Sequence, residues 1–110
     1  MVHEILTAAG VEHAKGRFLR LPEGTCAVYF DDIEVITADR VPSSDLKAPP
    51  RVYIHHVTIE LYEPVPDDKK ETAIEAELDA RWIEWSKQDR YWLNDLQRYQ
   101  TVYEFTYTTK

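Results

Sequence analysis

The sequence has 110 residues, of which 44% are hydrophobic and 30% charged, and its formal net charge is −7. This length suits one core and the composition is that of a folding chain, so we expect a single domain over residues 1–110. The negative charge repels phosphate groups, which argues against general nucleic-acid binding and against docking on anionic membranes. The one cysteine, Cys26, cannot form an internal disulfide. No long apolar run is present, so we expect neither a membrane span nor a signal peptide.

The first residues carry the pattern of a short helix. Val2, Ile5, Leu6 and Ala9 repeat at helical spacing and form one apolar face. Gly10 follows where a helix commonly ends, because glycine adopts a left-handed backbone easily. A helix of two turns is not stable alone, so we expect it to pack on the rest of the domain.

Strand and turn patterns follow. We expect an extended stretch over residues 11–18 and a turn over residues 21–24. A buried strand over residues 25–30 then leads, through a second turn at Asp31-Asp32, to a second strand over residues 33–38. The clearest interruption is the segment 39–50, which holds prolines and serines and predicts a long loop. Loops of this length are usually functional or disordered.

The second half alternates strand, helix and strands. Residues 51–63 form the strongest strand pattern, ended by Pro64 and Pro66. Asp68 and Glu71 have capping-box spacing and predict a helix from 68 to about 81. Its apolar stripe comprises Ile74, Leu78 and Trp82. Two further strands are expected at about 84–93 and 97–108, joined by a turn at Asn94-Asp95.

This order predicts an α+β domain, with a mostly antiparallel sheet and two helices packed on one face. We expect Ile74 and Leu78 to pack against sheet residues such as Val57, Ile59 and Leu61. The aromatic stripe of the last strand (Tyr99, Tyr103, Phe105 and Tyr107) could stack RNA bases. The net charge and the absence of a basic aromatic motif favour a core face instead.

No residue pattern predicts a catalytic centre, a metal site or a cofactor. His55 and His56 are consecutive in a strand and therefore point to opposite faces, so they cannot share one metal. Cys26 lies in an apolar strand and is expected to be a buried small hydrophobe, unless the fold brings a histidine to it. The acid pairs Asp31-Asp32 and Asp67-Asp68 lack the alternating ligand pattern of a calcium loop.

Several segments carry a family resemblance when they are taken in order. Residues 21–30 (LPEGTCAVYF) have the form of a proline-led first strand, and residues 57–62 (VTIELY) have the form V-x-[IV]-E-L-Y. The acidic helix from Asp68 to Arg81 follows, and residues 103–107 (YEFTY) close the series. Together with the leading helix and Phe18, the series resembles tail completion (tail terminator) proteins of long-tailed bacteriophages and of prophages in Gram-positive bacteria, over nearly the full length.

The resemblance implies a structural virion protein with no enzymatic activity. Members form a ring, commonly hexameric, at the head-proximal end of the tail, where the ring stops growth of the tail tube and joins it to the head connector. The implied partners are other copies of the chain, the tail tube protein and the head-completion or connector protein, while DNA passes through without specific binding. The implied location is the virion, after assembly in the cytoplasm of the bacterial host.

In such a ring the loop would be an assembly interface. We expect the segment 39–50 to be mobile in the monomer and to be ordered by a neighbouring subunit or by the tail tube. The candidate interface residues are Asp39, Arg40, Val41, Pro42, Ser43, Ser44, Asp45, Leu46 and Lys47.

Acidic side chains are expected to outnumber basic ones on the lumen of the ring, because basic groups would grip the DNA phosphates. The candidates, expected in loops, are Asp31, Asp32 and Glu34, or acids of the segment 39–50 such as Asp45. The alternative is that these charges only solvate the outer surface.

Two other functions are left open. The chain could be another small head–tail joining protein, or it could be a cytosolic binding module or small hydrolase that uses His55 or His56.

Overall fold

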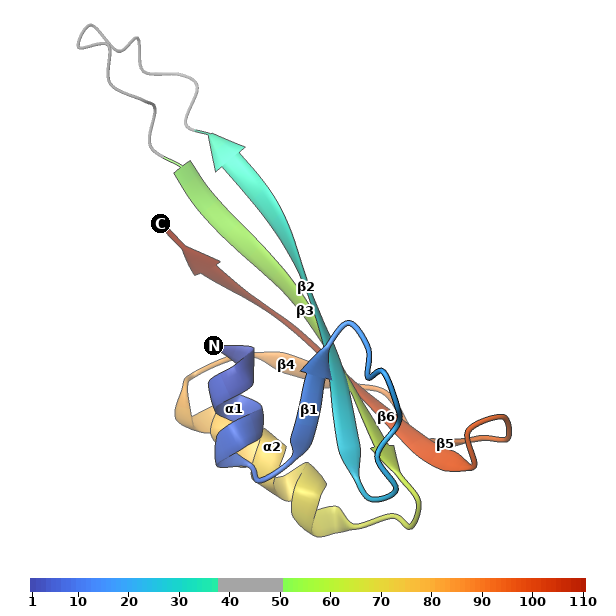
Figure 1. The fold of residues 1–110 in the computed structure, drawn as a ribbon. Coiled ribbons are helices and arrows are strands. Elements are labelled where there is room, and N and C mark those ends of the chain that lie inside the picture. Colours follow the sequence, from blue (N-terminus) through green and yellow to red (C-terminus); the bar gives the residue numbers. More distant parts are fainter. Residues whose placement is uncertain (38–50) are drawn as a thin grey trace, which may run out of the picture.

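The computed structural model describes residues 1–37 and 51–110. Its elements in chain order are α1 (Val2–Ala8), β1 (Glu12–Lys15), β2 (Cys26–Thr37), β3 (Arg51–Glu63), α2 (Asp68–Ala80), β4 (Trp85–Lys87), β5 (Tyr91–Leu93) and β6 (Arg98–Thr109). The sheet has the order β1-β2-β3-β6-β4, and β5 also pairs with β6. Among the described strands only β1 and β2 pair in parallel. Figure 1 shows both helices on the same side of the sheet, so the predicted α+β class is confirmed.

The main core lies between the two helices and one face of the sheet. Ile74 and Leu78 of α2 have no exposed surface, and they share one apolar cluster with Val57, Ile59 and Leu61 of β3. The predicted core packing is therefore confirmed. The residues that α1 and β6 add to the same cluster are Val2, Ile5, Leu6, Tyr103 and Phe105.

A smaller apolar cluster lies on the opposite, helix-free face. Cys26 is fully buried there with Val28 and Tyr62, and partly buried Phe18 and Leu21 pack against them. Burial raises the pKa of the Cys26 thiol, which makes the reactive thiolate scarce. Cys26 is therefore part of the packing, as the sequence predicts.

Strand β2 is longer than expected. It continues without a break from Cys26 to Thr37, so the predicted turn at Asp31-Asp32 is wrong. The reason is that β3 pairs with β2 residue by residue over this whole length, from Cys26 opposite Tyr62 to Thr37 opposite Arg51. A continuous ladder satisfies every backbone group on that side, which outweighs the turn preference of two aspartates.

The predicted strand at 84–93 is divided in two. Lys87 pairs with Tyr103 and Tyr91 pairs with Gln100, so three residues, 88–90, lie opposite two, 101–102. This is a one-residue β-bulge, which reverses the face to which the following side chains point. The turn after β5 lies at residues 94–97, where the sequence predicts it.

The start of α2 differs by one residue from the expected cap. Asp67, not Asp68, is the N-cap, and its carboxylate accepts a hydrogen bond from the Lys69 N–H at 2.9 Å. The buried Glu63 carboxylate fixes this entry because it accepts a hydrogen bond from the Asp67 N–H at 2.8 Å. Glu71 therefore takes no part in a capping box. The helix itself ends at Ala80, one residue before the expected end.

One end of the sheet extends beyond the helices. The described chain measures 59 × 29 × 22 Å along its principal axes, which is elongated for a domain of this size. Figure 1 shows β2, β3 and the end of β6 projecting as a narrow ribbon past α1 and α2. We call this extension the β-arm and define it as residues 30–36 of β2, 51–56 of β3 and 106–109 of β6.

Candidate assembly surface

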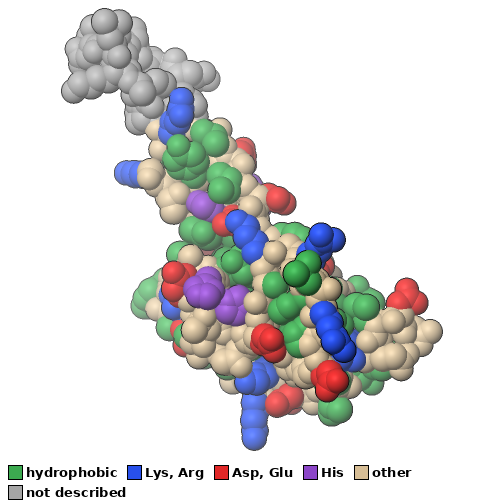
Figure 2. Space-filling view, viewed as in Figure 1, with side chains coloured by type: hydrophobic (Ala, Val, Ile, Leu, Met, Phe, Trp, Pro, Cys, Tyr) green, Lys and Arg blue, Asp and Glu red, His purple; other side chains and the backbone are tan. Residues whose placement is uncertain are grey.

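The β-arm exposes large apolar side chains of β2. Phe30, Ile33, Val35 and Ile36 are each between 38% and 54% exposed. Because strand residues alternate, Ile33 and Val35 lie on one face of the sheet and Phe30 and Ile36 on the other. Figure 2 shows hydrophobic side chains on the surface of the extension. Apolar residues grouped on both faces of a projecting sheet are typical of a surface that another protein covers.

The β-arm is also open along both of its edges. On one side β1 pairs with Cys26 to Tyr29, and no other described strand pairs with the rest of that edge of β2. On the other side β4 pairs with residues 103–105, and beyond Phe105 no described strand lies outside β6. The backbone groups along both edges can therefore accept another strand.

His55 and His56 point to opposite faces of the β-arm, which confirms the sequence argument. The His55 Nδ1 lies 3.0 Å from the Asp31 carboxylate, whereas the His56 Nε2 lies 3.0 Å from the Glu34 carboxylate. The His55 ring also stacks on Tyr107, with centroids 4.2 Å apart and planes 8° apart. The two imidazoles therefore have separate partners and cannot bind one metal ion.

On one face of the β-arm three side chains form a hydrogen-bonded series. Asp31 accepts from His55 Nδ1, so His55 Nε2 is left to accept from the Thr109 hydroxyl, which lies 3.0 Å away. This order of acid, imidazole and hydroxyl is that of an acyl-transfer triad. Such a site also needs donors aimed at the developing oxyanion. The backbone N–H groups of β3 beside His55 are directed toward the neighbouring strands β2 and β6, so β3 does not supply these oxyanion donors.

The acids Asp31, Asp32 and Glu34, expected in loops, all lie on β2, and their exposure differs. Asp31 has a side chain only 14% exposed and bound to His55, so it is not a free surface charge. Asp32 is exposed, and the Glu34 side chain is 57% exposed beside His56. Their expected position in loops is wrong, because β3 extends the ladder past them. Their facing a lumen stays a prediction.

The predicted interface loop, from Asp39 to Lys47, lies outside the described residues. In the sequence it lies between β2, which ends at Thr37, and β3, which begins at Arg51.

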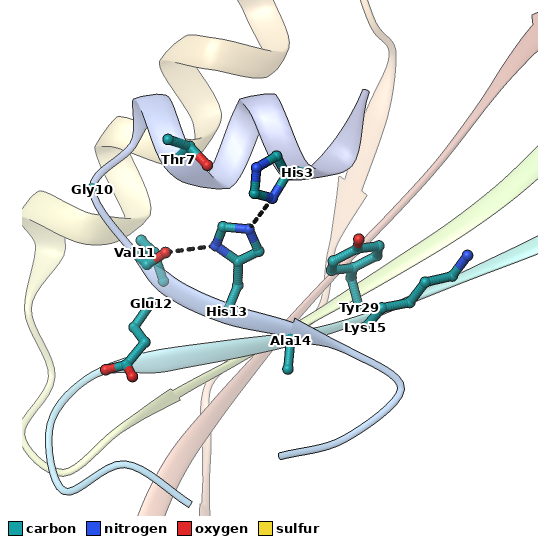
Figure 3. A pocket seen from close by; sticks show the side chains of 9 residues that line it. All are labelled: His3, Thr7, Gly10, Val11, Glu12, His13, Ala14, Lys15 and Tyr29. Atoms are coloured by element: carbon teal, nitrogen blue, oxygen red, sulfur yellow. Dashed lines mark hydrogen bonds between the residues drawn. The ribbon is translucent and has the colours of Figure 1, made fainter. Parts of the chain in front are cut away.

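A second cluster of polar groups lines an open hollow between α1 and β1. Figure 3 shows the imidazoles of His3 and His13 facing each other there, with Tyr29 beside them. His13 Nδ1 donates to the Val11 carbonyl at 2.8 Å, so its Nε2 accepts from His3 Nδ1, also at 2.8 Å. Two nitrogens are fewer than a stable zinc site requires, and no three candidate ligands converge anywhere in the described residues. Sequence spacing could not reveal this pair, because the rings come from different elements.

A partly buried charge network holds α2 to the sheet, and the sequence patterns missed it. Glu71 is 4% exposed and forms an ion pair with Arg90 of the bulge, while Lys87 lies between Glu71 and Glu75 at 3.2 and 2.8 Å. The Tyr103 hydroxyl donates to Glu75 at 2.7 Å, and burial together with this bond raises the pKa of Tyr103. Each of these charged groups has a partner of opposite sign, so the network positions elements and offers no free acid or base.

A scan against protein-family models and a search of curated proteins found no match to this chain. None of the helices in the described residues has the length and apolar character needed to cross a membrane. The geometry defines a class, a small α+β domain with a projecting three-stranded β-arm whose edges no described strand covers and whose apolar side chains are partly exposed.

Proposed function

We propose that this chain is a structural subunit that assembles with copies of itself into a ring at the head-proximal end of a bacteriophage tail. There it terminates the tail tube and joins it to the head connector. Its work is binding, with no turnover. The chain is located in the assembled phage particle. Its other partners there are the tail tube protein and the head connector.

The observation that carries this proposal is the β-arm. A three-stranded ribbon with two edges that no described strand covers, and with exposed Ile33, Val35 and Ile36, is costly for an isolated subunit in water. Burial against a neighbouring subunit removes that cost. The order of motifs in the sequence, which resembles the tail terminator family, supports the particular ring and its place in the tail.

The self-assembly part is tested with the purified chain by size-exclusion chromatography with light scattering, followed by negative-stain electron microscopy. We expect a multimer that appears as a closed ring. Val35→Glu on the β-arm should dissociate it, because a charge would be buried at the contact. Val65→Glu is the matched control, since Val65 is 71% exposed and lies outside the β-arm.

The place in the tail is tested with a purified tail tube protein of a long-tailed phage. We expect tubes grown in the presence of this chain to be shorter and to carry a ring at one end. A wild-type chain that stays monomeric at all concentrations contradicts the assembly role. Rings that leave tube length unchanged contradict the terminator role alone.

A further inference from the structure

The two open edges of the β-arm lie at the same level of the sheet. Asp32 pairs with His56, which pairs with Thr106, and Val35 pairs with Tyr53, which pairs with Thr109. The uncovered part of β6, residues 106–109, is therefore level with residues 32–35 of β2, on the other side of β3. Each copy therefore has two strand edges at the same position along the strand direction, one on each side of the sheet.

Acidic side chains are the protection that the β2 edge carries against pairing with a like edge. Residues 30–37 hold no proline and no lysine, and they include the β-branched residues Ile33, Val35 and Ile36. Native sheets usually protect such an edge with prolines, lysines, bulges or a covering segment. An edge of this length and composition therefore fits a partner strand.

Charge decides which strand the β2 edge accepts. Two β2 edges that paired with each other in antiparallel fashion would bring Asp32 and Glu34 of one copy beside the same acids of the other, and like charges across a strand pair are destabilising. The β6 edge carries no acid at residues 106–109 and is followed by Lys110. The β2 edge is thus complementary to β6 and repels a second β2.

The strand directions set the geometry of the joint. Both β2 and β6 are antiparallel to β3, so they run parallel to each other. A rotation about an axis along the strands keeps that direction, so each copy would present its β6 to the β2 of the next. Such a head-to-tail contact pairs both edges of every copy, and it forms a ring when the rotation from copy to copy closes.

We propose that copies of this chain join edge to edge, with the β6 edge (residues 106–109) of one copy paired in parallel with the β2 edge (residues 30–37) of the next. The joint rests on the self-assembly part of the proposed function, because it requires a multimer. It deepens that proposal by naming the strands that meet and their relative direction.

Engineered disulfides test the joint. Without stagger Glu34 lies level with Thr108, because both pair with Ile54, and both point to the helix-free face. Neighbouring strands are about 4.8 Å apart, which is within the Cα range of a disulfide. The double variant Glu34→Cys with Thr108→Cys should oxidise into a ladder of covalent multimers on a non-reducing gel. Glu34→Cys with Thr106→Cys tests a shift of two residues.

Three controls accompany the double variants. The unsubstituted chain should not cross-link, because its Cys26 is fully buried. Each single cysteine variant should give no ladder, because a head-to-tail joint needs one cysteine on each edge. Ile33→Cys with Thr108→Cys should give none either, because these side chains point to opposite faces of the sheet.

These experiments distinguish a failure of the edge-to-edge joint from a failure of the proposed self-assembly. Strong dimer formation by Glu34→Cys alone would show that two β2 edges meet, and would overturn the inference. A multimer by light scattering with no ladder from either double variant would also overturn it, while leaving self-assembly intact. A chain that is monomeric by light scattering overturns both.

Discussion

Leu78 shows how one side chain reports on the packing of a helix. It has no exposed surface and lies in the cluster that joins α2 to β3. Leu78→Ala should lower the free energy of unfolding by about 2–5 kcal/mol, because it removes buried methyl groups and leaves a cavity. Urea denaturation followed by circular dichroism measures this loss. Leu96→Ala is the control, since Leu96 is 42% exposed. A loss well under about 1 kcal/mol for Leu78→Ala would contradict the helix register.

Glu63 is the residue through which pH should act on stability. Its side chain has no exposed surface, and one carboxylate oxygen has no hydrogen-bond partner among the described residues. Burial raises the pKa of Glu63 above its usual value, so the folded state favours the protonated form. This contribution is fully present below the unfolded pKa and is lost as pH rises through the higher folded pKa.

Glu63→Gln should therefore be more stable than the wild type at neutral pH, and the difference should shrink as pH falls toward 4. The Gln amide oxygen can still accept the hydrogen bond from the Asp67 N–H. Thermal melts of both proteins across this pH range give the comparison. Glu12→Gln at an exposed strand position controls for the change in net charge. A variant less stable than wild type at neutral pH would show that the charged form of Glu63 is the favoured one.

The two helices end in the same motif but with different residues. In α1 the N–H of Val11 bonds to the Leu6 carbonyl, and the cap residue in the left-handed region is Gly10, with φ of 73°. In α2 the N–H of Ile83 bonds to the Leu78 carbonyl, and the corresponding residue is Trp82, with φ of 58°. Both are Schellman motifs, for which glycine is the usual cap residue.

Trp82 is 94% exposed, so the fold gains no packing from its ring. The expectation that Trp82 continues the apolar stripe of α2 is wrong, because the helix stops two residues earlier and the left-handed turn directs the ring outward.

Trp82→Gly should raise the free energy of unfolding by up to about 1 kcal/mol. Relief of the left-handed conformation is worth about 1–2 kcal/mol, and the greater freedom of glycine in the unfolded chain offsets part of it. Chemical denaturation measures the change. The reverse substitution, Gly10→Ala, should destabilise by about 1 kcal/mol at the equivalent position of α1. Loss of stability in Trp82→Gly would mean that the ring makes a contact that matters to the fold.

The net charge of the whole molecule predicts weak binding to DNA. With a net charge of −7 in each chain, the proposed ring would carry a strong negative field that physiological salt screens only in part. We expect the purified protein not to shift duplex DNA on a gel at low salt. A basic DNA-binding protein run beside it controls for the detection limit. Tight, salt-sensitive binding would contradict both this prediction and a role in which DNA passes freely through the ring.

Local patterns predicted those parts of the fold whose signals lie within one element. Apolar periodicity and turn residues within short stretches predicted three features. These are the apolar face of α1 with Gly10 after it, the bounds of β3, and the core pair Ile74 and Leu78. In each of these elements the apolar residues at regular spacing are the ones that the fold buries, so the sequence pattern identifies the core residues. The α+β class follows from their order.

Only the tertiary structure decided the features that depend on a neighbouring strand or helix. Asp31 and Asp32 continue β2 because β3 supplies a partner for each residue, and Asp67 is the N-cap because Glu63 holds its N–H. The β-arm exists because β2 and β3 are both longer than the layer of helices beside them. Its open edges are a relation between separate strands, which periodicity within a single strand cannot express.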